Sequence, residues 1–244
     1  MTIKRVLSKI RKADEEYNLI QDGDYIAVGL SGGKDSNLLL YCLYLYQFLA
    51  RGTFKKEFKI IGIHIDLNFG EEDFSIIEDW FKQYPIPLYH EKSMIADILK
   101  NHSSNARVEC SLCSTLKKGA VIKAAKKLGC NKVAFGHHAD DAIETLFMNM
   151  IYGGRVATFD PQMHLEREDI TFIRPFIWAF EKEIKKAVKE LELPAIKSGC
   201  PNDGNSSRQE IKDLLNNLYY QYPQAKENFL LALKNGNNKV NLFK

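Results

Sequence analysis

The chain of 244 residues has few cysteines, no long apolar run and no repeated or low-complexity tract. Five cysteines are an odd number, which argues against the disulfide framework of small secreted domains. The basic, amphipathic segment 1–12 lacks an unbroken apolar stretch and a small-residue cleavage site, so we expect no cleaved leader and no membrane span. Residence in the cytoplasm is the resulting expectation.

The composition is that of an ordinary enzyme. Hydrophobic residues make up 45% of the chain and charged residues 27%, enough to bury the core of one large domain with a small appendage. We expect an N-terminal helix over 1–20, a main domain over 21–195 and a C-terminal segment over 196–244.

The net charge is only +3, so a nucleic-acid surface would have to come from local clusters of cations. Three predicted helices carry such clusters: Lys4, Arg5, Lys9, Arg11 and Lys12; Lys117, Lys118, Lys123, Lys126 and Lys127; Lys182, Lys185, Lys186 and Lys189. A solvated helix face explains lysines at this spacing more often than not. The clusters support an RNA substrate without establishing one.

Strand-like and helical segments alternate along the chain, which predicts an α/β fold with a doubly wound parallel sheet and helical additions at both ends. The expected strands are 25–30, 58–66, 87–90 and 132–136; the expected helices are 2–17, 36–50, 73–83, 114–128, 139–151, 180–192, 207–220 and 223–234. Ligands bind beyond the carboxyl ends of such strands, which selects the loops after residues 30, 66 and 136.

The most informative motif is Ser31-Gly-Gly-Lys-Asp-Ser36, between the apolar run 25–30 and a helix. Its glycines let the backbone approach a polyphosphate, and N–H groups at the helix start point toward the anion. The serine hydroxyls and Lys34 supply further donors. It is not a Walker A loop, because Val28 and Asp35 occupy positions where that loop needs Gly and Ser or Thr. The alternative is an ordinary glycine-rich turn.

A second polar loop, Gly136-His-His-Ala-Asp-Asp141, follows the strand 132–136 and opens a helix. It would face the same crevice as the first motif. Asp140 or Asp141 would suit a helix cap. Two histidines and two carboxylates also suit magnesium binding, orientation of the activated atom or proton transfer.

Cys110-Ser-Leu-Cys113 lies directly before the expected helix 114–128. The helix start and the nearby Lys117 and Lys118 would favour the thiolate form. Two cysteines do not complete a metal site, and a tetrahedral zinc or a cubane cluster needs a further ligand.

The remaining cysteines are Cys42, Cys130 and Cys200. Cys42 falls inside an apolar helix and Cys130 precedes a strand, so we expect both to be small buried side chains. Cys200 stands in the polar loop 198–209, where a buried structural cysteine would be unexpected.

The six-residue motif resembles the PP-loop of the ATP pyrophosphatases, which cleave ATP to AMP and pyrophosphate while adenylating a substrate. Gly-His-His-Ala-Asp-Asp, the Cys-x-x-Cys pair and the later Asn-x-x-Arg-Gln are similar to the tRNA 2-thiocytidine synthetases in particular. Further matches are 113–119, Tyr152–Arg155 and Ile173–Pro175. The family's extra cysteine before the third ligand is replaced here by 195–199, and the tail 230–244 matches no family motif.

The resemblance implies ATP, Mg²⁺ and a [4Fe–4S] cluster as cofactors, with Cys110, Cys113 and Cys200 as cluster ligands. It implies catalytic roles for Lys34, Asp35, Asp141, Cys110 and Cys113. It places the nucleotide on Leu30, Ser31, Gly32, Gly33, Lys34, Asp35, Ser36, Ile63, His64, Gly136, His137, Asp141 and Arg174. Arg174 and Arg208 would contact phosphates of the nucleotide or of RNA. The alternative metal is zinc with His137 or His138 as a fourth ligand, and the alternative without metal is a redox-active thiol pair.

The implied reaction activates a pyrimidine C2 oxygen, of cytidine in tRNA, by adenylation and replaces it with sulfur from sulfide or a desulfurase-derived persulfide. A homodimer is also implied. Two other functions compete: a sulfurtransferase or ligase acting on a small molecule or another tRNA uridine, and an RNA-binding or redox-sensing module that ATP only regulates.

Overall fold

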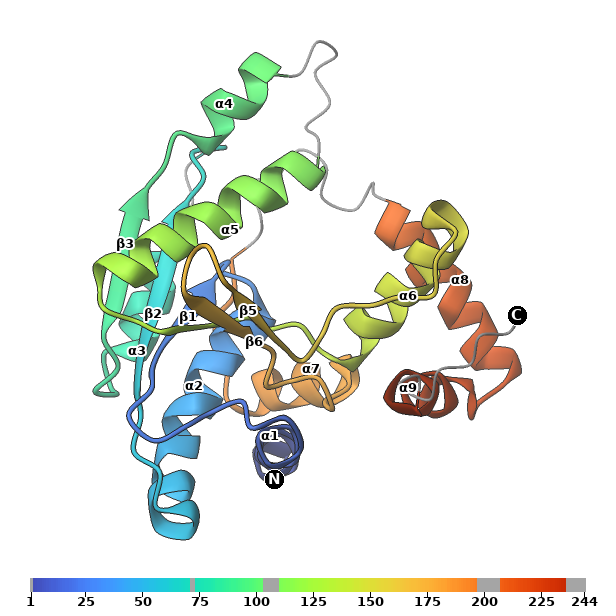
Figure 1. Ribbon diagram of the computed structural model, residues 1–244, viewed down its shortest axis with the longest axis horizontal. Coiled ribbons are helices and arrows are strands. Elements are labelled where there is room, and N and C mark those ends of the chain that lie inside the picture. The colour runs from blue at the N-terminus through green and yellow to red at the C-terminus, as the bar shows by residue number, and fades with distance from the viewer. Residues whose placement is uncertain (1, 71–72, 103–109, 197–206, 236–244) are drawn as a thin grey trace. The chain divides into compact units, whose positions relative to one another are not determined.

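The computed structural model describes residues 2–70, 73–102, 110–196 and 207–235 (Figure 1). The chain divides into two compact units. The first, Met1–His138 with Pro161–Asp203, contains a β-sheet and its covering helices. The second, Ala139–Asp160 with Gly204–Lys244, is built from helices in its described part.

The sheet has six strands in the order β3-β2-β1-β4-β6-β5. These are β1 (Tyr25–Leu30), β2 (Lys59–Asp66), β3 (Leu88–Lys92), β4 (Lys132–Ala134), β5 (Gln162–Leu165) and β6 (Ile170–Ile173). All neighbours pair in parallel except β5, which joins β6 antiparallel. The register sets Leu30 beside His64 and Ala134 beside Ile173. The carboxyl ends of β1, β2, β4 and β6 therefore share one edge, where such sheets bind ligands.

Helices cover both faces of the sheet because the strands are apolar on both sides. Ala27, Ile61 and Val133 pack with Val121 and other residues of α5 (Cys110–Lys127) on one face. Gly62 alternates with Ile61 and faces Leu40 of α2 (Lys34–Leu49) on the other. Figure 1 shows α5 crossing the sheet on the side away from α2.

The other helices of the first unit complete these two layers. α1 (Thr2–Tyr17) and α7 (Glu181–Glu190) pack with each other and with α2, and α4 (Ile95–His102) packs with α5. A short π-helix, η1 (Ala50–Phe54), continues α2, and α3 (Ser75–Phe81) lies between β2 and β3 in the chain.

The second unit consists of α6 (Ala139–Gly153), α8 (Ser207–Gln221) and α9 (Ala225–Asn235) in its described residues. Ile143, Ile211 and Leu215 form its buried core, and the rings of Phe147 and Phe229 pack against it. The centroids of these two rings are 5.1 Å apart.

The predicted α/β fold with helices on both faces is confirmed, and the bounds predicted for α1 and β1 agree with the structure. The all-parallel sheet was wrong at its edge, because the hairpin of β5 and β6 adds an antiparallel strand through a short connection. The eight-residue helix α4 was not predicted. The helix after the cysteine pair begins at Cys110 instead of near Ser114, so the pair lies in its first turn.

Candidate nucleotide site and cysteine pair

The turn after β1 is shaped by Gly32, whose φ of +76° lies in the left-handed region that glycine adopts without strain. Ser36 Oγ accepts a hydrogen bond from the Ser31 N–H at 3.2 Å and donates one to the Gly33 carbonyl at 3.0 Å. Helix α2 begins at Lys34, and its N-cap residue, Gly33, has no side chain that could accept hydrogen bonds from the first N–H groups of the helix. The first N–H groups of α2 therefore present the positive end of the helix to an anion at this turn.

The segment 194–196 holds the turn from a second side. The Ile196 N–H donates to the Gly32 carbonyl at 3.0 Å, and Asn37 Nδ2 donates to the carbonyls of Gly32 at 3.3 Å and Pro194 at 2.9 Å. A Cβ at Gly32 would lie 2.6 Å from Ile196 Cδ1, which is closer than packed carbon atoms approach. We call residues 31–36 the phosphate turn. Its shape thus depends on contacts with residues 194–196, which precede Cys200 in the chain.

Lys34 lies between two carboxylates. Its Nζ is 3.0 Å from Asp35 Oδ2 and 3.4 Å from Glu181 Oε1, and Glu181 Oε1 also pairs with Lys185 Nζ at 3.0 Å. Partial burial lowers the pKa of Lys34, but the attraction of Asp35 and Glu181 outweighs it and leaves that pKa raised. Lys34 therefore carries its positive charge at neutral pH, as a ligand of phosphate requires.

Two polar atoms beside the turn are buried without a hydrogen-bond partner among the described residues: Asp35 Oδ1 and Asn37 Oδ1. Buried acceptors of this kind cost free energy unless a ligand, ion or water satisfies them. A carboxylate oxygen is also a ligand that Mg²⁺ prefers. The site therefore fits a magnesium-bound nucleotide on the chemistry of its own side chains.

The loop after β4 passes tightly against the start of α2. A Cβ on Gly136 would lie 3.0 Å from both Asp35 C and Ser36 N, so only glycine fits without a shift. His137 and the buried His138 follow Gly136 directly. Arg174, which is 4% exposed, follows β6, the neighbour of β4. The structure thus brings Gly136 against the phosphate turn and places Arg174 at the same edge of the sheet.

His64 belongs to the same edge. Its Nδ1 lies 3.0 Å from the Leu30 carbonyl oxygen, and Nδ1–H donates this hydrogen bond because a carbonyl only accepts. Phe74 stacks on one face of the ring, with centroids 3.9 Å apart and planes 9° apart. The His90 ring packs edge-on at 4.9 Å, and His64 is 2% exposed, so its ring is enclosed by its neighbours.

Asp141 lies in the second unit, in the first turn of α6, and it pairs with Arg208 of α8. Arg208 Nη1 is 3.1 Å from Asp141 Oδ1 and 3.5 Å from Glu144 Oε2, whose side chain is only 6% exposed. Lys226 of α9 forms an ion pair with the neighbouring Asp140. The role predicted for Arg208 was a phosphate contact, whereas the structure places its guanidinium on two carboxylates.

The structure describes only part of the predicted cysteine set. Cys113 is 7% exposed and packs into the apolar cluster under α5, while Cys200 lies outside the described residues. Cys42 and Cys130 are buried at 0% and 6% exposure, as predicted for small core side chains. Burial raises the pKa of the Cys130 thiol to about 11 and raises that of Cys42 as well.

The two thiols of Cys110 and Cys113 are donors of the kind that iron–sulfur clusters and zinc bind. Cys110 and Cys113 both lie in the first turn of α5, where the positive helix end stabilises thiolates. Within the described ranges no group of three metal-ligating side chains gathers, and the third predicted ligand, Cys200, stands outside those ranges.

Three residues at the phosphate turn were not predicted from the sequence: Asn37, Glu181 and Ile196. Each acts through a contact with a residue distant in the chain or through a backbone carbonyl. Glu181 is one of three glutamates in the lysine-rich helix α7, so no local sequence pattern distinguishes it from the other two.

The fold and the turn together define a nucleotide-binding domain of the PP-loop type. A family model described as a PP-loop domain matches residues 3–218. In the described part of the chain, no helix is long and apolar enough to cross a membrane.

Curated relatives match the chain along nearly its whole length. A tRNA-cytidine(32) 2-sulfurtransferase of Ralstonia pickettii is 33% identical over 95% of this chain and 72% of its own. The protein of the same name from Citrifermentans bemidjiense is 34% identical over 95% of this chain and 90% of its own. Among solved structures, the U34-tRNA thiolase NcsA from Methanococcus maripaludis, with its [4Fe-4S] cluster, superimposes with a TM-score of 0.75 at 24% identity, covering 98% of this chain and 80% of that one. The chain belongs to the PP-loop family of the tRNA-cytidine(32) 2-sulfurtransferases.

Proposed function

We propose that this protein is an ATP-dependent tRNA sulfurtransferase that converts a cytidine to 2-thiocytidine and releases AMP and pyrophosphate. The observation that carries the proposal is the turn after β1, where the left-handed Gly32, the start of α2 and the charged Lys34 lie within three successive residues. The family supplies the class of substrate, because the matching relatives are named for thiolation of cytidine 32 in tRNA.

The proposed reaction has two steps, adenylation of the C2 oxygen and its displacement by sulfur. In the first, the C2 oxygen of cytidine attacks the α-phosphorus of ATP, and pyrophosphate leaves. In the second, a sulfur nucleophile adds to C2, and AMP departs with the original C2 oxygen. The first step converts a poor leaving group into a good one, which is why ATP is consumed.

The phosphate turn would stabilise the first step. Lys34 and the N–H groups of Gly32, Gly33 and Ser36 would face the charge that develops on the phosphates, as preorganised dipoles in a site of low dielectric. Ser31 would hold the turn through its contact with Ser36. Asp35 would hold magnesium through Oδ1, because Oδ2 already pairs with Lys34.

Other residues at the sheet edge would position the nucleotide. Ile63 and His64 would border the adenine, while Leu30 fixes His64 through its carbonyl. Gly136, His137 and Arg174 would line the approach to the phosphates. Asp141 would bind magnesium or orient the activated group, and Arg208 would then have to release or share it.

Cys110, Cys113 and Cys200 would hold a [4Fe–4S] cluster. Three ligands would leave one iron open, and that iron would supply a Lewis acid for binding the incoming sulfide. Sulfide would donate the sulfur directly. A desulfurase-derived persulfide would donate it only with a thiol as two-electron reductant, which cleaves the sulfur–sulfur bond and releases the carrier thiol. The active protein would be a homodimer.

The metal content tests this assignment. Iron, acid-labile sulfide and zinc are measured on protein purified without oxygen, for the native sequence, Cys110→Ala, Cys200→Ala and the matched control Cys130→Ala. We expect about four irons per chain in the native protein and in the Cys130 variant, and a loss in the other two, with ATP binding kept in all four. Zinc in place of iron, or iron retained in Cys200→Ala, would contradict the ligand assignment.

A further inference from the structure

Of the three lysine-rich helices, α5 alone has no acidic residue. Its 18 residues include five lysines and no aspartate or glutamate. Helix α1 combines five cations with Asp14, Glu15 and Glu16, and α7 combines four lysines with Glu181, Glu183 and Glu190. A phosphate backbone that approaches α5 therefore meets no carboxylate on that helix.

The cations of α1 and α7 are partly neutralised by these acids. Arg5 pairs with Glu183 at 3.5 Å and Arg11 with Glu15 at 3.8 Å, while Lys185 pairs with Glu181. On α5, Lys118 and Lys123 are exposed, and no described residue forms an ion pair with either. Lys126 lies 3.9 Å from Glu168, at the outer end of the range for an ion pair.

Helix α5 also contains Gly119 in its interior, and packing does not explain this glycine. Glycine in a helix interior costs roughly 1 kcal/mol relative to alanine, so it usually has a packing or functional reason. A Cβ at Gly119 would meet no described atom within 4 Å, and the residue is exposed. The missing side chain leaves room for close approach by an external group next to Lys118 and one turn before Lys123.

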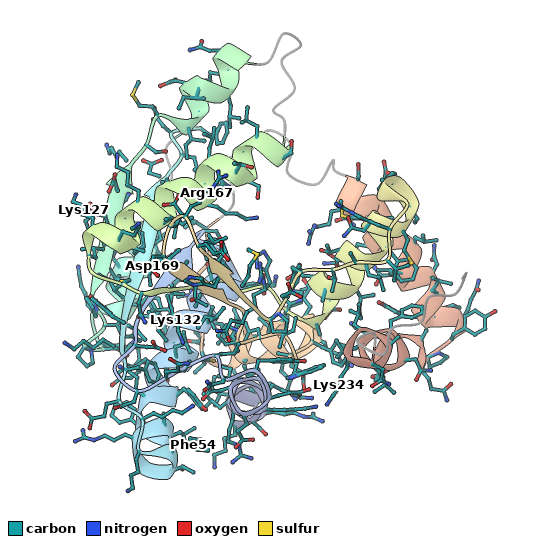
Figure 2. All side chains as sticks on the ribbon, in the orientation of Figure 1. Phe54, Lys127, Lys132, Arg167, Asp169 and Lys234 are labelled. Atoms are coloured by element: carbon teal, nitrogen blue, oxygen red, sulfur yellow. The ribbon has the colours of Figure 1, made fainter. Side chains whose placement is uncertain are left out.

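Eight positions of α5 are exposed among those whose side chains the structure describes. Seven of them form the α5 stripe: Ser111, Ser114, Thr115, Lys118, Gly119, Lys123 and Lys126. The eighth, Lys127, donates to the Tyr89 hydroxyl at 2.9 Å. At 1.5 Å per residue the stripe is about 22 Å long, enough for several phosphates. It begins beside the cysteine pair in the first turn. Figure 2 labels Lys127 at the opposite, carboxyl end of the helix.

We propose that this α5 stripe binds the phosphate backbone of tRNA and leads it to the cysteine end of the helix. The proposal rests on the proposed function for the kind of RNA. Lysines bind phosphates, serine and threonine hydroxyls donate to them, and Gly119 permits close contact. The acid-free sequence selects α5 over α1 and α7.

The test compares two charge reversals of equal size. Lys118→Glu with Lys123→Glu alters the stripe, and Lys186→Glu with Lys189→Glu makes the same change in net charge on exposed α7 lysines. Binding of unmodified tRNA is measured at several salt concentrations, with ATP binding as the control for folding. We expect the α5 variant to lose about tenfold or more in affinity and its salt slope to fall by about 1.4 to 1.8, with the α7 variant within about twofold. Equal losses in both variants would overturn the proposal.

Gly119→Gln tests the stripe without changing charge. Glutamine is a good helix former, so the thermal midpoint should stay the same or rise, while tRNA affinity falls several-fold because the side chain fills the open position. Unchanged affinity would contradict the role of Gly119. Thiolation by the native protein tests the proposed function separately. A protein that binds tRNA through α5 without thiolating it would overturn that function and leave the stripe supported.

Discussion

Lys34 Nζ lies 3.4 Å from Glu181 Oε1, which joins the phosphate turn after β1 to the first residue of α7. Together with Asp35, this carboxylate holds the lysine at the turn. A polyphosphate would have to take over Lys34 from two carboxylates. Glu181 therefore holds Lys34 Nζ beside the turn and competes with an incoming phosphate for it.

Replacing Lys34 by alanine should abolish ATP cleavage. We expect the rate of tRNA-dependent AMP formation to fall at least about a hundredfold, the size associated with loss of one preorganised charge in an active site. The matched control is Lys185→Ala, because Lys185 shares Glu181 but lies outside the turn; its rate should stay within about twofold. Similar losses in both variants would assign the effect to the ion-pair network and not to phosphate binding.

The turn should tolerate a methyl group at Gly33 far better than at Gly32. Gly32→Ala forces a left-handed backbone on alanine, at roughly 1–2 kcal/mol, and drives Cβ into Ile196. A Cβ at Gly33 meets only Ser31 Oγ, at 3.3 Å. Calorimetric titration with ATP should show binding lost in the first variant and weakened much less in the second. Equal ATP affinity of the two variants would contradict this, because it would mean that the turn accommodates the Gly32 methyl group without losing binding free energy.

The two core cysteines should resist alkylation in the folded protein. Burial raises the pKa of Cys130 to about 11 and that of Cys42 also, so both thiols stay protonated at neutral pH and only the thiolate reacts. Reactivity of Cys130 should therefore increase only as the pH rises toward that pKa. Peptide mass spectrometry after iodoacetamide treatment near pH 8, with and without urea, measures this. Rapid modification of Cys130 without urea would contradict its burial.

The guanidinium of Arg208 should stabilise the second unit. Arg208→Gln leaves the buried Glu144 without that cation, and because the arginine side chain is 43% exposed we expect a loss of about 1 kcal/mol. Urea unfolding followed by circular dichroism measures the loss. In a Glu144→Gln background the same change should cost clearly less. Additive effects of the two substitutions would show that the pair contributes nothing.

Patterns within short segments predicted much of this structure. The alternation of apolar segments gave α1 and β1 their bounds, and the motif 31–36 identified the phosphate turn. Strands β5 and β6 were both missed. Each is only four residues long, and Gln162–Leu165 is also mostly polar or exposed, so it has no strand pattern. The start of α5 was misplaced because Ser and Cys residues near 110–114 look like a loop before a helix.

Contacts between distant segments were beyond prediction from one sequence. The packing of Ile196 on Gly32, the ion pair of Lys34 with Glu181 and the capture of Arg208 by Asp141 each join residues from separate elements. No periodicity or spacing encodes such pairs, since they depend on how the elements pack. The prediction that Arg208 contacts phosphate followed from its charge alone, and the structure shows the carboxylates that compete for it.

The most direct test of the proposed function is nucleoside analysis of tRNA after reaction. Unmodified tRNA is incubated anaerobically with the iron-loaded protein, ATP, Mg²⁺ and sulfide, then digested and examined by mass spectrometry, with Lys34→Ala as the blank. We expect 2-thiocytidine in an amount that matches the AMP released, and none with the Lys34→Ala variant. AMP release without any thiolated nucleoside, or sulfur on a uridine instead, would contradict the proposed function.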